Sequence, residues 1–152
     1  SGSMSKIGAY AFGNCTSLST ASFPVCTTIG ANAFYSCTSL STASFPACTS
    51  IGASAFYNCT SLSTASFPAC TSIGASAFYS CRGLLSLYLL GSSVPKLYNA
   101  SVFRSTPISN YTTSTGGVYG SIIVQASMLE AFKVATNWSV YSSRFSVWNG
   151  VD

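Results

Sequence analysis

Apolar and polar positions follow a fixed order that repeats every 22 residues along the first half of the chain. The clearest copy is 49–70, with the sequence TSIGASAFYNCTSLSTASFPAC; a nearly identical copy precedes it at 27–48, and half a copy follows at 71–81. A fixed period of this length is typical of solenoids, in which each unit buries its apolar face against its neighbours. The pattern therefore predicts a stacked array of units.

Each unit divides into a strand half and a turn half. In TSLSTASFPAC, Leu62, Ala65 and Phe67 are expected inward and Ser66 outward, which is the two-residue period of a strand with one buried face. In the turn half, IGASAFYNC, Gly52 offers the permissive backbone that a corner needs. The inward turn positions are Ile51, Ala55, Phe56 and Cys59. Two phenylalanine ladders should result, one of Phe12, Phe34, Phe56 and Phe78 and one of Phe23, Phe45 and Phe67.

The spacing LxxLxLxxC within the strand half matches the leucine-rich-repeat template. The units resemble the bacterial BspA-like leucine-rich repeats, whose pattern is IGxxAFxxCxxLxxxxxP. The matching residues are Ile29, Gly30, Ala33, Phe34, Cys37, Leu40 and Pro46, with their equivalents one unit later. The resemblance covers roughly residues 5–94 and implies a secreted or surface-exposed bacterial binding protein. It does not identify a ligand.

After residue 81 the repeat loosens. Leu84, Leu87 and Leu89 keep the strand register, and after an insertion, GSSVP, Leu97 and Phe103 match the Ile and Phe of a stretched last turn. The segment from 95 onward is similar to the C-terminal segment that often ends such arrays in gut bacteria. Together with Trp138, the tail also has the apolar area to close the last rung, which favours a cap over a separate binding module.

The tail also predicts one helix. Ser127 and Glu130 form an S-x-x-E capping box, and the helix is expected to continue to Asn137. Its apolar face would combine Leu129, Phe132 and Ala135. The other expected elements are a turn over 112–120 and strands over 121–125 and 144–148.

We therefore predict a β-rich fold of the α/β repeat class, namely a leucine-rich-repeat right-handed solenoid. It would have a parallel sheet on one side, short turns or 3₁₀ segments on the other, and a C-terminal cap containing one α-helix. Residues 1–4 are interpreted as an expression remnant, 5–94 as the solenoid of 22-residue units, and 95–152 as a degenerate last turn and C-terminal cap.

Charged residues are scarce, with six Lys or Arg, two Asp or Glu and a net charge of +4. The cations are scattered, whereas nucleic-acid binding needs several along one face, so no nucleic-acid partner is expected. No run of 18 apolar residues exists, so no membrane insertion is expected. No signal-peptide pattern is present either, so a secreted or cell-surface bacterial protein would have its signal and anchor outside this sequence.

Side chains for catalysis are also missing. The chain has no histidine, one Glu and one Asp, so paired carboxylates, a Ser/His/Asp triad and a Cys/His dyad are unavailable. Calcium and magnesium sites need several oxygen anions in one place. We therefore predict no enzyme activity, no cofactor and no metal.

Seven cysteines recur every 11 residues, which could indicate disulfides, a zinc site or core packing. No CxxC pair of the kind that zinc sites use is present. Neighbours in a ladder would be about 4.8 Å apart, whereas the Cβ atoms of a relaxed disulfide prefer about 3.8 Å. Buried free thiols are therefore favoured. The ladders would be Cys15, Cys37, Cys59 and Cys81, and Cys26, Cys48 and Cys70.

Two outward rows are candidate ligand-binding residues. The sheet row is Thr20, Ser22, Thr42, Ser44, Thr64 and Ser66, and the tyrosine row is Tyr35, Tyr57 and Tyr79. Leucine-rich-repeat proteins more often bind through the sheet, so the resemblance favours the sheet row for a protein partner. Tyrosine is common in binding hot spots and can stack on sugars, which favours the tyrosine row for a glycan. The alternative is that the rings only stack on each other and shield the turns.

The patterns leave several functions open. The first is an adhesion module that recognises a host protein, a glycan or another cell-surface ligand. A spacer or stalk also fits, because a stalk of near-identical units needs no ligand-specific variation. A prophage tail-fibre component and an ice-binding surface are further alternatives.

The first repeat has no polar cap, so the array is expected to come from a longer one. We also expect the chain to self-associate through this repeat, because Lys6 is the only residue that protects its strand edge from pairing.

Overall fold

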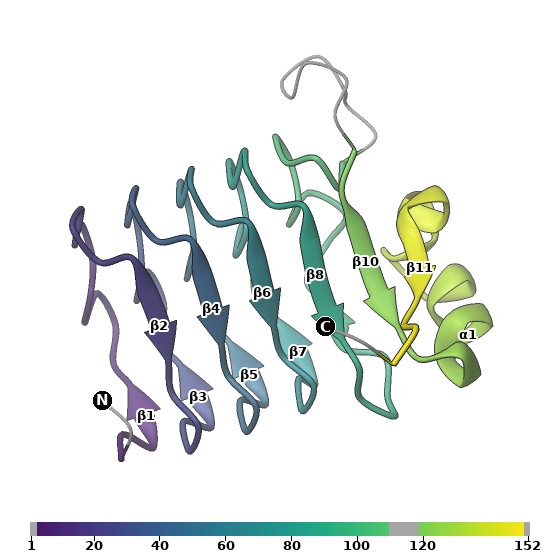
Figure 1. Ribbon diagram of the computed structural model, residues 1–152, viewed down its shortest axis with the longest axis horizontal. Coiled ribbons are helices and arrows are strands. Elements are labelled where there is room, and N and C mark those ends of the chain that lie inside the picture. Colours follow the sequence, from purple (N-terminus) through teal and green to yellow (C-terminus); the bar gives the residue numbers. More distant parts are fainter. Residues whose placement is uncertain (1–2, 110–118, 151–152) are drawn as a thin grey trace.

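The computed structural model describes residues 3–109 and 119–150, which form an elongated solenoid with two parallel sheets (Figure 1). Most of the expected turn over 112–120, namely residues 112–118, lies outside the described residues. In order, the six-stranded sheet contains β2 (Thr20–Ser22), β4 (Thr42–Ser44), β6 (Thr64–Ser66), β8 (Ser86–Leu89), β10 (Ser121–Val124) and β11 (Phe145–Val147). The five-stranded sheet contains β1 (Lys6–Ile7), β3 (Thr28–Ile29), β5 (Ser50–Ile51), β7 (Ser72–Ile73) and β9 (Lys96–Leu97).

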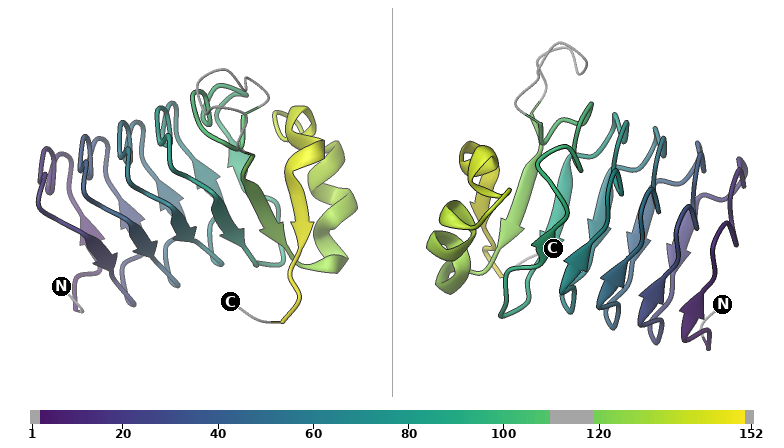
Figure 2. Two further views of the ribbon diagram at one scale, coloured as in Figure 1. Left: turned by 45° about the horizontal axis from the view of Figure 1, so that its top comes forward. Right: turned by 180° about the vertical axis from the view of Figure 1, so that it is seen from behind.

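Residues one repeat apart lie side by side, so each 22-residue unit is one rung. Thr20 pairs with Thr42 and Thr42 with Thr64 in the six-stranded sheet. Both views in Figure 2 show the rungs stacked in sequence order from the N-terminal end to the cap. The predicted leucine-rich-repeat solenoid is thereby confirmed.

The second sheet was not anticipated, because only turns or 3₁₀ segments were expected on that side. The backbone N–H of Gly52 donates to the Ile29 carbonyl of the preceding rung at 2.8 Å, and Gly30 donates to Ile7 at 2.7 Å, which continues a short parallel ladder. The following turns contain left-handed residues, such as Asn32 with φ 57° and Ser36 with φ 55°. A 3₁₀ helix requires negative φ throughout, so these residues form hydrogen-bonded turns instead.

The role of the repeat glycine also differs from the expected one. The conformation of Gly52 is not left-handed, since the left-handed positions of this turn are Ser54 and Asn58. A Cβ atom at Gly52 would lie 2.7 Å from the backbone nitrogen of Ala31 in the preceding rung. Glycine is therefore needed at this position because two backbones approach closely, and not because the corner requires a positive φ.

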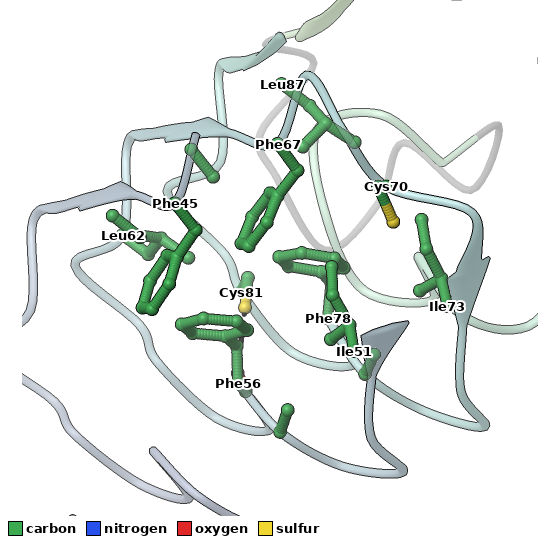
Figure 3. Close-up of a cluster of buried hydrophobic side chains, with 14 of the residues drawn as sticks. Phe45, Ile51, Phe56, Leu62, Phe67, Cys70, Ile73, Phe78, Cys81 and Leu87 are labelled. Carbon is green, nitrogen blue, oxygen red and sulfur yellow. Dashed lines mark hydrogen bonds between the residues drawn. The ribbon is translucent and has the colours of Figure 1, made fainter. Parts of the chain in front are cut away.

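The core contains both predicted phenylalanine ladders, which Figure 3 shows meeting edge to face. Phe34 and Phe56 stack with ring centroids 5.1 Å apart, and Phe45 and Phe67 stack at 5.4 Å. Phe56 meets Phe67 across the core at 5.8 Å and an interplanar angle of 68°. Alternating stacked and edge contacts are the arrangements that aromatic rings prefer, so the rungs interlock along their whole length.

The cysteines are free, as predicted. Six of the seven are buried, and Cys15 in the first rung is half-buried. The thiols of Cys37 and Cys59 donate to the carbonyls of Phe12 and Phe34 in the preceding rung, at 3.0 and 3.1 Å. This ladder therefore supplies hydrogen bonds between rungs as well as apolar packing.

The last rung and the cap close the C-terminal end. Leu97 pairs with Ile73, and Phe103 stacks on Phe78 at 5.6 Å, as predicted for the stretched turn. Beyond β10 come a 3₁₀ turn, Ala126–Met128, then α1 (Leu129–Val134) and a second 3₁₀ segment, Ser139–Arg144. Trp138 is completely buried between Phe103 and Phe132.

The expected capping box is wrong, although the helix is present. Ser127 lies within the 3₁₀ turn, Met128 is the N-cap of α1, and no side chain forms a capping hydrogen bond. The helix ends at Val134 and not at Asn137, because the next residues turn to anchor the cap. The Asn137 side chain donates to the Leu97 carbonyl at 2.9 Å.

Candidate ligand-binding surfaces

The outer face of the six-stranded sheet presents the predicted sheet row. Within each strand the middle residue is buried and the flanking hydroxyl residues face outward. Thr20, Ser22, Thr42 and Ser44 are exposed, and Thr64 and Ser66 are half-buried. The parallel register places equivalent hydroxyls beside one another, so the face consists of two straight hydroxyl rows.

Other hydroxyls of the repeat are used internally. Ser63 Oγ donates to the Ser41 carbonyl at 3.1 Å, and Thr49 Oγ1 donates to Thr27 at 3.2 Å, each across one rung. The repeat thus has hydroxyls that donate to the neighbouring rung in addition to those of the sheet row. Thr49 is itself exposed, so its oxygen can still accept a hydrogen bond from a ligand.

The predicted tyrosine row lies in the turns that follow the inward phenylalanines. Tyr35 and Tyr57 stack at 5.0 Å, and Tyr57 and Tyr79 at 5.1 Å, with rings parallel to within 3°. All three tyrosines are half-buried, and Arg104 occupies the equivalent position on the next rung. Because the rings cover one another's faces, mainly their edges and hydroxyl groups remain for a partner.

A third surface was missed by sequence reasoning. On the outer face, Tyr88 pairs with Ser66 on one side and with Ile123 on the other, so the serine row becomes aromatic and apolar. Trp148, which follows β11, is 38% exposed. The alignment of Leu87 and Leu89 with the strand half already implied that Tyr88 faces outward, so the signal was present in the sequence.

Two hollows flank Tyr88. One, of about 480 Å³, is lined by Ser44, Thr64, Ser66, Tyr88 and Leu90. The other, of about 290 Å³, is lined by Ser86, Tyr88, Ser121, Ile123, Ser146, Val147, Trp148 and Asn149. Both hollows lie on the same sheet face, on either side of Tyr88, and together they extend from β4 to β11; we refer to the pair as the groove.

Charged groups contribute little to these surfaces. Lys133 and Glu130 form an exposed ion pair at 3.9 Å on α1. The Arg144 guanidinium lies over the Tyr119 ring, 4.0 Å from its centroid. Among the described residues, no charged side chain lines either hollow.

The thiols lie in the core, away from these surfaces. Burial raises the pKa of Cys37 and Cys70 to about 12 and that of Cys48 to about 11. These thiols therefore stay protonated at neutral pH, where a nucleophile would need to be a thiolate.

Over residues 3–109 and 119–150, no group of three or more His, Cys, Asp or Glu could hold a metal ion. None of the helices in these ranges has the length and apolar character needed to cross a membrane.

Comparisons with known proteins agree with this architecture. Residues 1–115 match the family model described as the BspA type leucine rich repeat region, in six copies. The crystal structure of a leucine rich cell surface protein from Faecalibacterium prausnitzii A2-165 is similar, with a TM-score of 0.51 and 23% sequence identity. The similarity covers 80% of this chain and 43% of that one, so this chain spans less than half of its length. A comparison with curated proteins gave no match.

The structural similarity establishes the fold, and the family match establishes the type of repeat. The match extends over most of the 152 residues and includes the repeats that stack as rungs. The chain belongs to the BspA-type leucine-rich-repeat family.

Proposed function

We propose that this chain is a non-catalytic binding module of a bacterial cell surface or secreted protein. It would recognise a host protein, a glycan or another cell-surface ligand through the repetitive outer surface of the solenoid. The observation that carries this proposal is the outer face of the six-stranded sheet, where hydroxyls recur in register from rung to rung. The similar bacterial structure, described as a leucine rich cell surface protein, supports the location.

The regular spacing favours a ligand that is itself repetitive. Each rung offers a small hydroxyl pair with modest hydrogen-bonding strength, such as Thr42 and Ser44. Weak contacts on successive rungs add through multivalency when the ligand can span several of them at once. A polymer or a dense cell-surface coat meets this condition better than a small molecule does.

Catalysis is not part of this proposal. The chain has no histidine and only two acidic residues, so general acid–base chemistry has few candidate groups. The buried thiols are held protonated in the core, away from the outer face.

The experiment is a binding assay with the labelled chain on intact epithelial cells, on mucin-coated plates and on a glycan array. One variant carries Thr20→Lys, Thr42→Lys and Thr64→Lys, and a second carries Tyr35→Ser, Tyr57→Ser and Tyr79→Ser. We expect the parent chain to bind, and the lysine variant to lose at least tenfold in affinity because bulky cations would cover the sheet row. Circular dichroism checks that each variant is folded.

A spacer is the second candidate, favoured by the near-identity of successive rungs on their outer face. A stalk needs rigid stacking between rungs. The stacked phenylalanines and the hydrogen bonds that side-chain hydroxyls donate to the preceding rung provide it. If the parent chain binds and neither triple variant weakens that binding, the array is a spacer and the site lies in the tail. A genomic location among phage tail genes would favour the tail-fibre variant of this hypothesis.

A further inference from the structure

We propose that the groove on the outer face of β4, β6, β8, β10 and β11 binds a neutral oligosaccharide, with Tyr88 and Trp148 as its stacking residues. This inference rests on the proposed binding function and assigns to it a ligand class and a place. The groove consists of the two hollows, of about 480 and 290 Å³, that share the Tyr88 side chain.

The groove has the dimensions of an extended ligand. It crosses four strand intervals from β4 to β11, which corresponds to roughly 19 Å at the usual strand spacing. Both hollows are open surface depressions on one sheet face and not a deep cavity. A linear chain lying across the strands could contact both, whereas a small compact molecule would occupy only one.

The groove is also where the repeat stops being uniform. Ser22, Ser44 and Ser66 form the outward row of the first three strands, and Tyr88 and Ile123 replace serine in the next two. The buried positions of the same strands stay apolar, as in Leu87 and Ile122. The buried middle position also changes, from Ala65 to Leu87, but neither of these side chains lines the hollows. The change in the core therefore does not account for an aromatic ring on the outer face.

The lining has the chemistry that recognises sugars. The rings of Tyr88 and Trp148 provide apolar faces for the C–H surface of a sugar. Ser86, Ser121 and Ser146 line the same hollow with hydroxyls that can donate or accept hydrogen bonds. Such a combination of flat rings and small hydroxyls suits a polyol and offers little to an extended apolar peptide.

The charge distribution favours an uncharged ligand. The lining residues of both hollows, all within the described part of the chain, include no charged side chain. Arg144 directly precedes β11, but its guanidinium is held over the Tyr119 ring at 4.0 Å. A uronate or phosphate group in the groove would lack the ion partner that its desolvation requires.

The test uses the whole chain and a glycan array of neutral oligosaccharides that includes cellopentaose, chitopentaose and maltopentaose. Pentagalacturonic acid is the anionic probe, and a proline-rich decapeptide represents the peptides that dock in aromatic grooves. Binding is followed by tryptophan fluorescence, because Trp148 is 38% exposed and Trp138 is completely buried. Calorimetry gives the affinities of the variants that lack Trp148.

We expect at least one neutral probe to bind and to shift the Trp148 emission. Tyr88→Ser and Trp148→Ser should each weaken that binding roughly tenfold, the size of a lost aromatic contact. Tyr88→Ser recreates the side chain of the preceding rung, so the fold should be unaffected. The matched control is Tyr98→Ser, which removes a ring that is 64% exposed beside the five-stranded sheet and should leave the affinity unchanged.

Several results would overturn this inference. They are the absence of binding to any neutral probe, tighter binding of the anionic probe or the peptide, or equal affinities of the Tyr88→Ser variant and the parent chain. The proposed function would survive each of these if the chain still bound cells and the sheet-row lysine variant abolished that binding. The two proposals therefore fail separately.

Discussion

At the residue scale, the two cysteine ladders differ in what their thiols contact. Cys59 and Cys81 donate to the carbonyls of Phe34 and Phe56 in the preceding rung, at 3.1 and 3.0 Å. Cys48 donates within its own strand segment, to Ser50 at 3.3 Å. The spacing of the cysteines predicted their burial, but it could not predict these acceptors, which depend on how one turn lies over the next.

The raised thiol pKa values predict a loss of stability at alkaline pH. Thiols ionise above about pH 9 when unfolded, but Cys48 and Cys70 do so only near 11 and 12 in the folded chain. Above pH 9 the unfolded state therefore binds fewer protons than the folded state, and the free energy of unfolding falls as pH rises, by about 1.4 kcal/mol per pH unit for each such thiol. Urea denaturation between pH 7 and 11 measures this slope.

The matched control for that slope is Cys48→Ala, which should show a shallower decrease than the parent chain. An identical slope in both would contradict the assignment to Cys48.

A thiol assay in denaturant without reductant should count seven thiols. A count of one or three would mean that disulfides form.

A second residue-scale prediction separates close packing from backbone conformation. In Gly52→Ala the new Cβ atom would lie 2.7 Å from the backbone of the preceding rung. The variant should therefore lose at least about 1 kcal/mol in free energy of unfolding, which is the usual cost of forcing a methyl group into a packed site. Ser54→Asn, two residues later, should be neutral or slightly stabilising, because Ser54 has φ 55° and asparagine tolerates that region. Chemical denaturation of both variants makes the comparison, and equal effects would argue against the steric explanation.

At the scale of elements, tertiary contacts decide where the cap helix begins and ends. The Trp138 indole donates to the Pro95 carbonyl at 2.7 Å, and Gln125 donates to the Leu90 carbonyl. These contacts attach both sides of α1 to the last rung. The local signal from Ser127 and Glu130 is weaker than this attachment, so the helix is shorter than its sequence predicts.

We accordingly expect Ser127→Ala to change the free energy of unfolding by less than about 0.5 kcal/mol, whereas loss of a true N-cap costs about 1 kcal/mol. Trp138→Phe should cost more, about 1 to 3 kcal/mol, because it leaves the buried Pro95 carbonyl without its donor. Thermal or urea unfolding of the two variants tests the contrast. If Ser127→Ala lowered the free energy of unfolding more than Trp138→Phe did, Ser127 would be acting as an N-cap, which would contradict this interpretation.

The repeat part of the fold could be predicted from the sequence because its signal occurs several times over. The inward positions, the two phenylalanine ladders and the packed thiols all follow from one unit, and register then repeats them. The two-residue strands such as β3 were not predictable in this way, because two residues carry no periodicity and their pairing depends on the neighbouring rung. The Tyr88 groove could not be predicted for a different reason. Tyr88 lies where the repeat changes, and a repeated spacing gives no information about a position that departs from it.

At the scale of the whole molecule, the two ends of the core differ. At the C-terminal end Trp138 and Phe132 cover the last rung and are completely buried. In the first described rung Phe12, Cys15 and Leu18 are only partly buried, whereas their equivalents Phe34, Cys37 and Leu40 are fully covered. Within the described residues, β1 and β2 each pair on one side only, as do β9 and β11 at the other end, so the ends differ in how the core is covered.

This asymmetry predicts that the chain of 152 residues self-associates through its first rung. Sedimentation equilibrium across a hundredfold concentration range should show dimers or larger species, because unpaired strand edges and partly exposed core side chains favour pairing. Leu18→Lys should shift the population toward monomer. Ser61→Lys places the same charge on an exposed turn of an interior rung and should have no effect, and a parent chain that stays monomeric throughout would contradict the prediction.

The direction of the bonds between rungs has a consequence under mechanical load. The β-ladders and hydroxyl bonds, such as Thr71 to Thr49 at 2.9 Å, all join a rung to its neighbour along the long axis. A force that pulls the two ends apart along that axis opens these bonds one rung at a time, so the array should unwind by peeling and not by a single rupture. Each released 22-residue rung would extend to roughly 75 Å. Single-molecule pulling should therefore give a series of equal extensions at low force. Such stepwise yielding would let the array lengthen under load without losing all of its rungs at once.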